Sequence, residues 1–429
     1  MREKQIAIPA STFFNGLGFR LLIACAIFGA TLWRYYGREH PHRLCGTGYE
    51  SLQLACSLAE TGNFSDPFRV LPTGPSAHLA PLFPAYVSLL VRFFGRDTSA
   101  GLALAWSAVA IIGLHLALLP FLSRHFGFGL SPGVVGASIF LFARPPLYPM
   151  WESFYVALLA IVLAFPMYDI LEGRASKAKV TLSGILWGIM LWTATVPVLI
   201  MLAWVAWVFA KIRLPRQQRL ILLFLPFLVV APWLIRNFVV FHHFIFVRDN
   251  LGLELAASNN SCATFSFMTN EFSRCFKINH PNEGLDQAER VRQLGEYAYN
   301  QTRQHEAVEW IRANPKRFAE LTWLRIVAFW FLSRTGHLLP DSRMPPAVLA
   351  VWFMTLLSIP GLWLMWKKNP SAAGILALWL LFFSPIYYIV QFDPRYRFPI
   401  LWVTLLLAGF LIAELAKGIR TRFGRKPEF

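Results

Sequence analysis

The feature that most constrains this chain is a succession of apolar runs. A transmembrane helix needs roughly 17–25 mostly apolar residues, and several stretches of the 429-residue chain reach that length. The chain is 56% hydrophobic and only 15% charged, and a soluble protein of this size would carry more charge. The sequence therefore predicts an all-α polytopic membrane protein.

We expect about ten transmembrane helices. The run 179–211 is long, and "TATVP" interrupts it, so we divide it into two short spans with a break near Pro197, because proline removes a helix hydrogen bond. Another span follows "YPMWESF" and ends at "DILEGRASKAK". The remaining spans are placed at about 17–35, 99–122, 130–143, 218–238, 346–366, 372–390 and 396–416.

The charge pattern predicts the orientation. The net charge is +17, and Lys and Arg crowd the cytoplasmic loops of membrane proteins, so we expect no nucleic-acid partner. The basic segments "WKKNP" and "GIRTRFGRK" are predicted to be cytoplasmic, which places both termini inside. Two external loops result, at 37–97 and 239–345. The short apolar segments 81–95 and 321–332 are expected to lie at the membrane surface.

The external loops carry most of the polar sequence. Residues 286–315 predict one amphipathic helix that ends at Asn314-Pro315. No stretch resembles a detachable soluble domain, so residues 1–429 are predicted to form a single integral membrane domain. The first apolar run has a basic flank but no small-residue cleavage site, which favours an uncleaved anchor.

Four of the five cysteines fall in the predicted external loops. Cys262 and Cys275 either form a disulfide, if the compartment is oxidising, or stay free. The other two external cysteines are Cys45 and Cys56, and no CxxC pair suggests a metal site. Cys25 lies in the first span, where we expect it to serve packing.

The first external loop opens with "YESLQLACSLAETGNFSDPF", residues 49–68. Helical spacing places one polar face opposite an apolar one. The pattern alone fits a structural surface helix as well as a functional one. The polar face contains Tyr49, Gln53, Cys56 and Glu60, and the apolar face contains Leu52, Ala55 and Leu58.

Four segments in order resemble the GT-C superfamily, the polytopic glycosyltransferases that use polyprenyl-phosphate sugars. They look most like bacterial relatives of protein O-mannosyltransferases and lipid A aminoarabinose transferases. The segments are 49–68, "TGPSAHLAPLFPAYVSLLVRFFG", "APWLIRN" with the following "VRDNLGLELAASNN", and "DPRYRFPI". The resemblance implies a GT-C-like fold whose first external loop lines the active site.

The resemblance also suggests two catalytic carboxylates. Cys45 stands where these transferases usually carry an aspartate, so the catalytic role is carried to Glu50. A different acid, or a catalytically inactive homologue, are the alternatives. Glu152, where the fourth span begins, takes the place of the second acid. A carboxylate flanked by aromatic residues at a membrane boundary is costly unless it is used or paired.

A leaving phosphate needs positive charge. Arg395, Arg397 and Arg236 lie at the external ends of predicted spans and are candidate donor-phosphate ligands, with generic headgroup anchoring as the alternative. Arg92 fits an anchor better than a ligand. Tyr49, His78 and Tyr396 are expected to bind substrate. The sequence leaves a metal site unknown and a divalent cation as an open cofactor.

Together these features predict a glycosyltransferase. It would be an inverting enzyme that transfers a sugar from a polyprenyl-phosphate-linked donor to a glycan, lipid or protein acceptor, in contact with membrane lipid. The expected location is a bacterial inner membrane, with the active site on the periplasmic, external side. The alternatives are a transporter or flippase of lipid-linked intermediates, and a structural assembly factor. Acids and arginines at the external boundary favour the enzyme over a transporter, whose ionisable groups lie near the middle of the membrane.

Overall fold

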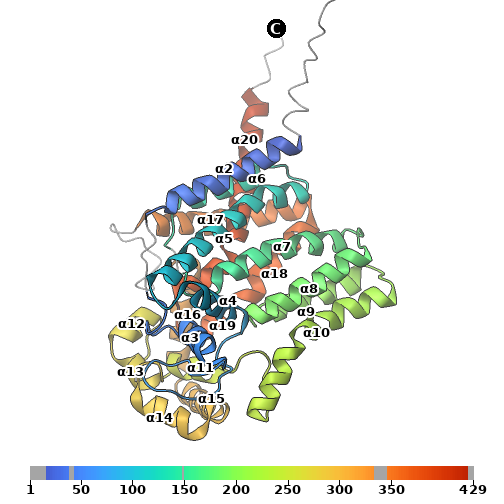
Figure 1. Ribbon diagram of the computed structural model, residues 1–429. Helices are drawn as coiled ribbons and strands as arrows, with labels where there is room; N and C mark the ends of the chain where they lie inside the picture. Colours follow the sequence, from blue (N-terminus) through green and yellow to red (C-terminus); the bar gives the residue numbers. More distant parts are fainter. Residues whose placement is uncertain (1–15, 38–42, 147–148, 333–344, 424–429) are drawn as a thin grey trace, which may run out of the picture.

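The computed structural model describes residues 16–37, 43–146, 149–332 and 345–423. Within these ranges the chain folds into helices joined by turns, and no β-strand forms beyond two isolated bridges. Figure 1 shows long helices layered across the molecule, with a cluster of shorter helices at one end. The predicted class, an all-α polytopic membrane protein, is confirmed.

Ten helices correspond to the ten predicted spans. Pro197 caps the start of one of them, so the predicted break near this residue is confirmed. The helices are α2 (Leu17–Tyr35), α5 (Thr98–His125), α6 (Ser131–Ala143), α7 (Ser153–Leu171), α8 (Lys177–Thr193), α9 (Val198–Lys211), α10 (Arg216–Phe241), α17 (Pro346–Lys368), α18 (Pro370–Phe383) and α20 (Phe398–Phe423).

Seven segments of the described chain are long and apolar enough to cross a membrane. They comprise α2, α5, α7, α10 and α17, together with Pro370–Ile389 and Pro394–Thr421. The other three helices of the predicted set are shorter, with 13 residues in α6, 17 in α8 and 14 in α9. The count of about ten spans therefore stays a prediction.

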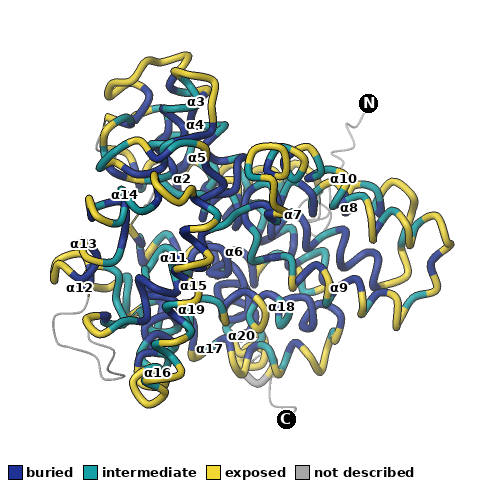
Figure 2. The backbone as a smooth tube through the Cα atoms, turned by 90° about the horizontal axis from the view of Figure 1, so that it is seen from below, coloured by how far each residue is buried: buried dark blue, intermediate teal, exposed yellow. Residues whose placement is uncertain are grey.

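Close helix contacts hold the centre of the bundle together. A Cβ atom on Gly409 of α20 would lie 2.2 Å from the carbonyl oxygen of Pro132 in α6. A Cβ on Gly136 of α6 would lie 2.7 Å from the carbonyl oxygen of Leu405. Small residues allow helix backbones to approach this closely inside a membrane, where dispersion contacts replace the hydrophobic effect. Accordingly, both of these glycines and Pro132 are among the buried residues of α6 and α20, and Figure 2 shows α6 near the middle of the molecule.

Most of the shorter helices lie in the two predicted external loops, and two very short ones lie just before the last long helix. The predicted single helix over 286–315 is wrong, because Gly295 adopts a φ of +80° and divides it into two. Glycine takes this left-handed conformation without steric cost. The loop helices are α3 (Glu50–Thr61), α4 (Leu82–Phe94), α11 (Leu251–Ser258), α12 (Phe267–Phe272), α13 (Cys275–Asn279), α14 (Leu285–Leu294), α15 (Glu296–Ala313) and α16 (Pro315–Phe331), followed by α19 (Ile386–Ile389) and the 3₁₀ helix η1 (Pro394–Arg397).

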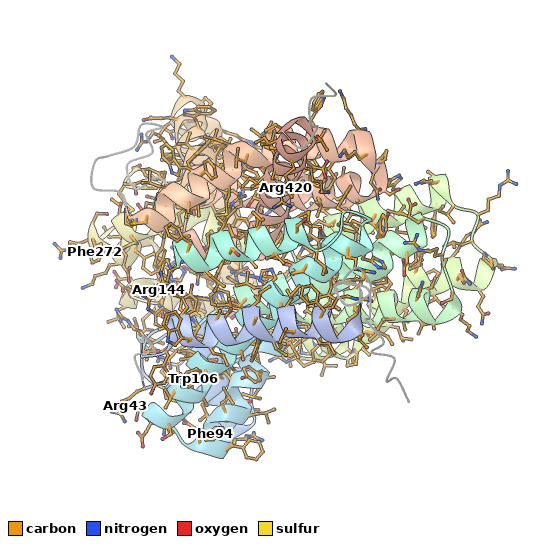
Figure 3. The ribbon with its side chains drawn as sticks, turned by 90° about the horizontal axis from the view of Figure 1, so that it is seen from above. Arg43, Phe94, Trp106, Arg144, Phe272 and Arg420 are labelled. Carbon is orange, nitrogen blue, oxygen red and sulfur yellow. A yellow bond between two sulfur atoms is a disulfide. The ribbon has the colours of Figure 1, made fainter. Side chains whose placement is uncertain are left out.

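Large apolar side chains cover parts of the outer surface, as a lipid-facing protein requires. Phe94 at the end of α4 and Phe272 at the end of α12 are both exposed and project from the edges of the molecule (Figure 3). Cys25 is exposed on α2 as well. The prediction that Cys25 packs inside the protein is therefore wrong, because α2 lies at the periphery with only part of its surface covered.

Two disulfides stabilise the loops. Cys262 and Cys275 are bonded, with their Cα atoms 5.7 Å apart, so the disulfide alternative for this pair is confirmed. The second disulfide joins Cys45 and Cys56, whose Cα atoms are 5.8 Å apart, and the sequence did not suggest it. The Cys45–Cys56 disulfide thus connects the segment before α3 to the helix itself.

Candidate active site

Two cavities meet between the loop helices and the ends of the spans. One, the polar cavity, has a volume of about 450 Å³ and is lined by loop residues that include Arg69, Glu271 and His280. The other, the apolar cavity, has a volume of about 440 Å³ and is lined by span residues that include Leu199 and Phe382. Five side chains line both cavities: Glu50, Trp151, Glu254, Arg395 and Tyr396.

Glu50 is the first residue of α3. The chain reaches it through Gly48, which has a φ of +87°, and Tyr49 caps the helix. A helix N-terminus favours a negative charge, but burial raises the pKa of the Glu50 carboxyl to about 7. The charge of Glu254 raises this pKa further, while Arg395 lowers it. Glu50 can therefore exchange a proton near neutral pH.

Glu254 reaches the same place from α11. Its carboxylate accepts a hydrogen bond from the side-chain amide of Asn250, at 3.4 Å. Burial raises the pKa of Glu254, and Arg248 and Arg395 partly offset that rise. Two buried carboxylates that repel each other favour a state in which one of them holds a proton. This state leaves a neutral and an ionised carboxyl at the junction of the two cavities.

Arg395 provides the positive charge at the junction. Its guanidinium carbon lies 3.3 Å from the centroid of the Trp151 ring, and its backbone N–H donates to Asp393 Oδ1 at 2.9 Å. Tyr396 accepts a bond from Nη2 at 3.3 Å. The buried Nε and Nη1 atoms make no hydrogen bond to a described residue, and Nε lies 3.8 Å from Asp393 Oδ2 in an ion pair. These two donors can form hydrogen bonds to an anion.

A second arginine lines the apolar cavity alone. Arg248 Nε donates to Asn250 Oδ1 at 2.8 Å, which fixes the side chain ahead of α11. Apolar side chains surround it from the α8–α9 break, α9 and α18, including Val196, Leu199 and Phe382. The apolar cavity thus combines cationic groups with a wall suited to a hydrocarbon chain.

Four predicted site residues line these cavities besides Glu50. Arg395 and Tyr396 line both, Tyr49 lines the polar cavity, and His78 lines the apolar one. His78 is buried, and burial lowers its pKa well below the usual value. A neutral imidazole does not balance a phosphate charge, so His78 can act there only through hydrogen bonds.

Glu152 lies beside this junction but lines neither cavity. It is the residue before α7 and next to Trp151, and its charge acts on Arg395 and on Tyr387. It therefore belongs to the electrostatic surroundings of Arg395. The structure does not bring its carboxylate to the cavity wall with Glu50.

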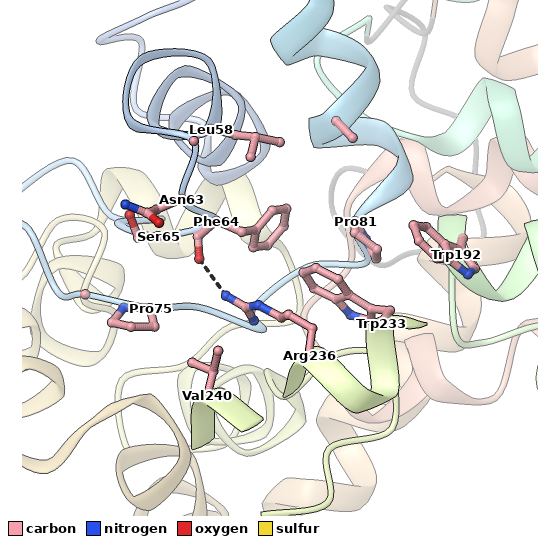
Figure 4. Close-up of a pocket in the computed structure, with 13 residues that line it drawn as sticks. Leu58, Asn63, Phe64, Ser65, Pro75, Pro81, Trp192, Trp233, Arg236 and Val240 are labelled. Carbon is pink, nitrogen blue, oxygen red and sulfur yellow. Dashed lines mark hydrogen bonds between the residues drawn. The ribbon is translucent and has the colours of Figure 1, made fainter. Parts of the chain in front are cut away.

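Arg397 and Arg236 lie outside both cavities. Arg397 is buried under the ring of Trp330, 4.2 Å from its centroid, and contacts hydroxyls of Thr355 and Thr404. Arg236 donates to the carbonyl oxygens of Phe64 and Ser76, at 3.0 and 2.7 Å, and lies against Trp233 (Figure 4). Both arginines join segments of the protein and do not extend towards the junction.

Sequence reasoning missed three side chains of the site: Glu254, Arg248 and His280. The first two lie in "VRDNLGLELAASNN", which carried the family resemblance. An acid inside an otherwise apolar helix was the available signal for Glu254. His280 had no comparable signal, because its position depends on a fold that brings residues of the two loops together.

The described residues do not provide a set of ligands for a metal ion. No group of three or more His, Cys, Asp or Glu side chains in these ranges is arranged to hold one. The cationic side chains that these cavities offer to a phosphate include Arg248 and Arg395.

Comparison with known proteins gives a structural relationship only. No family model and no curated protein matches the sequence. The fold is similar to the oligosaccharyltransferase of Archaeoglobus fulgidus, solved in complex with an inhibitory peptide and a dolichol-phosphate, with 12% identity and a TM-score of 0.53. A second structure of that enzyme, tethered to an acceptor peptide containing the NVT sequon, gives 13% identity and a TM-score of 0.57.

The match covers 97% of this chain and 53% or 52% of the archaeal chain. This chain therefore spans about half the length of the enzyme that it resembles. At this identity the likeness concerns the fold and leaves residue roles to be argued from the site itself. Over nearly its whole length, the chain therefore has a fold similar to that of the archaeal oligosaccharyltransferase.

Proposed function

We propose that this protein is a membrane glycosyltransferase that transfers a sugar from a polyprenyl-phosphate-linked donor to an acceptor at the external face of the membrane. The observation that carries the proposal is the meeting of a polar and an apolar cavity at two carboxylates and Arg395. A lipid-linked sugar has an apolar end and a polar end, and its scissile bond lies between them.

The apolar cavity is assigned to the donor. Its wall of aliphatic and aromatic side chains suits a prenyl chain. Arg248 and Arg395 would bind the phosphate, because their guanidinium groups form charge-assisted hydrogen bonds to its oxygens. Tyr396, which lines both cavities, is assigned to the neighbouring part of the donor.

The polar cavity is assigned to the transferred sugar and the acceptor. Aromatic faces from Tyr49, Trp151 and Phe276 line it together with carboxylates and amides. Side chains of these kinds pack against sugar rings and bind hydroxyl groups. The fold similarity to an oligosaccharyltransferase supports a lipid-linked donor in general, and the identities of sugar and acceptor remain open within the proposal.

Glu50 is assigned as the general base. Glu254 already accepts a hydrogen bond from Asn250, whereas Glu50 accepts none from another side chain in the described ranges. In the proposed step, an acceptor oxygen bonds to the anomeric carbon as the carbon–oxygen bond to phosphate breaks. The acceptor proton passes to Glu50, and the bonding electron pair leaves with the phosphate. A single displacement of this kind inverts the anomeric centre.

The proposal includes the arrangement in the membrane. Residues 1–429 form one integral membrane domain, with loops 37–97 and 239–345 on the external side and both termini in the cytoplasm. The external side corresponds to the periplasmic face of a bacterial inner membrane. Support comes from the basic segments between the predicted spans and from the two disulfides in the proposed external loops, since disulfides persist in oxidising compartments.

The test uses the full-length protein reconstituted in lipid nanodiscs. It is incubated with polyprenyl-monophosphate sugars of several kinds and with peptide, lipid and oligosaccharide acceptors, and products are identified by mass spectrometry. We expect transfer with one donor, and none with Glu50→Gln. A flippase would instead move labelled donor across proteoliposomes without consuming it. Absence of both donor cleavage and transfer over the full panel would overturn the proposal.

A further inference from the structure

His280 follows α13 and lies at the wall of the polar cavity. Its side chain is only 2% exposed. The imidazole stacks on Phe276, with ring centroids 4.3 Å apart, and the edge of Phe68 packs against it. Its backbone N–H also donates to the Phe276 carbonyl at 2.8 Å. The ring therefore has a fixed position and orientation.

A backbone hydrogen bond determines which nitrogen of this ring carries the proton. The backbone N–H of Asn282 donates to His280 Nδ1 at 3.2 Å, so Nδ1 is the acceptor and Nε2 carries the hydrogen. Burial, with a contribution from the charge of Arg303, lowers the pKa of His280 to about 3. The ring is therefore neutral at physiological pH and offers one N–H donor at Nε2.

The Nε2 atom faces Glu50. The distance from Nε2 to Glu50 Oε1 is 3.8 Å, which is too long for a hydrogen bond. Both residues line the polar cavity. An oxygen atom about 2.8 Å from each, the usual length of a hydrogen bond, would lie about 2 Å to the side of the line that joins them. One ligand hydroxyl in the polar cavity, beside the pair, can therefore contact both atoms at once.

We propose that His280 positions the acceptor, because its Nε2–H donates to the same acceptor hydroxyl oxygen whose proton Glu50 removes. This role rests on the proposed function. The hydroxyl donates to Glu50 and accepts from His280, so its remaining lone pair is directed at the anomeric carbon. As the proton passes to Glu50, Nε2–H stabilises the negative charge that develops on oxygen. His280 itself neither gains nor loses a proton.

The charges around the pair agree with this division of roles. Glu254, Arg395 and Arg248 act on Glu50, and Arg303 acts on His280. Burial and Glu254 raise the pKa of Glu50 to about 7, and Arg395 and Arg248 partly offset that rise, so the ionised base is available near neutral pH. Arg303 disfavours imidazolium at His280. A neutral donor beside an ionisable base is the arrangement that a hydroxyl nucleophile needs.

Two substitutions separate a donor role from a packing role. His280→Gln places an amide nitrogen near the position of Nε2, whereas His280→Asn retains an acceptor near Nδ1 but is too short to reach Glu50. We expect His280→Asn to lower kcat roughly 10²-fold, as removal of one oxyanion donor does, with the KM for the lipid donor unchanged. The kcat of His280→Gln is expected to be at least tenfold higher than that of His280→Asn. His305→Asn, at an exposed position of α15, is the matched control.

A second measurement is independent of turnover. Nitrogen-15 NMR of the histidine-labelled protein should show His280 protonated at Nε2 alone, without titration between pH 5 and 8. If the wild type is active, three results would overturn the role of His280 alone. These are an unchanged kcat in His280→Asn, equal losses of kcat in His280→Asn and His280→Gln, and titration of His280 near pH 6.5. Inactivity of the wild type with every donor and acceptor would overturn the proposed function, and this role with it.

Discussion

The guanidinium of Arg395 lies over the ring of Trp151, with its central carbon 3.3 Å from the centroid of the ring. Trp151 belongs to the segment before α7, and Arg395 to η1 just before α20. The contact therefore joins two parts of the chain that are distant in sequence, and it orients the Nε and Nη1 donors, which make no hydrogen bond to a described residue. A planar cation on an aromatic face keeps its edge free for hydrogen bonding.

Arg395→Lys should distinguish orientation from charge. Lysine keeps the positive charge but loses the planar stacking on Trp151 and the forked donors. We expect the KM for the lipid-phosphate donor to rise roughly 10- to 100-fold, in keeping with the loss of one charge-assisted hydrogen bond of about 1.5–3 kcal/mol, and Arg395→Ala to be more severe. Arg96→Ala, at an exposed site, is the control. Unchanged donor kinetics in both Arg395 variants would remove this residue from the donor site.

Glu50→Gln should abolish most activity while the fold persists. The substitution preserves side-chain size, and burial already disfavours the charged form of Glu50, so the melting temperature should not fall. Turnover should drop by roughly 10²–10⁴, the usual contribution of general acid–base assistance. Glu60→Gln, at the other end of α3, is the matched control, since its carboxylate is 39% exposed and pairs only with Arg96 in the described ranges. Near-normal transfer by Glu50→Gln would exclude it as the base.

Activity should depend on pH through the Glu50–Glu254 pair. The base must be ionised, and the pKa of Glu50 is about 7, so kcat/KM should fall about tenfold per pH unit below 7 and level off above it. Because Glu254 raises the pKa of Glu50, Glu254→Gln should move this limb to lower pH. The measurement is the pH at which kcat/KM begins to fall, and not the maximum value of kcat/KM. A limb that does not move would show that the two carboxylates are not coupled.

Stability should also depend on pH through a second buried acid. Glu296 on α15 accepts a hydrogen bond from the backbone N–H of Ala77, and burial raises its pKa to about 8. The folded chain therefore keeps a proton that the unfolded chain loses near pH 4.5, so this group's contribution to stability falls as pH rises between about 4.5 and 8. Glu296→Gln should flatten the decline in melting temperature over that window. If the melting temperatures of the wild type and Glu296→Gln fall in parallel over this pH window, the raised pKa of Glu296 would be contradicted.

The sequence predicted the long helices better than the site. Apolar runs and the "TATVP" interruption identify these helices within several residues, because these signals are local. Glu50 and Arg395 were predicted to share a site, and both line the two cavities. Arg397, only two residues from Arg395, instead points into the protein under Trp330.

The remaining site residues depend on non-local contacts. His280 faces Glu50 only because loop segments more than 200 residues apart come together, with the Asn282 side-chain amide donating to the Gly48 carbonyl at 2.7 Å. Arg236 at the end of α10 was predicted to bind phosphate, but carbonyl groups from the first loop occupy its donors. Sequence periodicity gives the face of a helix but not the partner that this face will meet.

Cysteine labelling should establish the orientation. With Cys25 replaced by Ser, an engineered cysteine at Lys316 should react with a membrane-impermeant maleimide from outside, and one at Arg216 only after permeabilisation. Lys316 lies in the first turn of α16 within the proposed external loop, and Arg216 begins α10 after a basic segment. Arg343, in the same proposed loop as Lys316, lies outside the described residues. Labelling of Lys316 and Arg216 positions from the same side would contradict the proposed topology.

Loss of the Cys262–Cys275 disulfide should impair the polar cavity more than the bundle. Cys275 begins α13, and the same short segment carries Phe276 and His280 to the cavity wall. A disulfide that closes a loop of about 15 residues contributes about 3 kcal/mol in the chain-entropy model. The double variant Cys262→Ser/Cys275→Ser should therefore lower the melting temperature and raise the KM for the acceptor, while the KM for the lipid donor stays unchanged.

Cys25→Ser is the control for this variant, because Cys25 is free and exposed on α2. It should leave both KM values and the melting temperature as in the wild type. Alkylation before and after reduction, read by mass spectrometry, should show four protected thiols in the native protein. If the double variant raises the donor KM equally, the segment around α13 serves both cavities, and the assignment of the polar cavity to the acceptor fails.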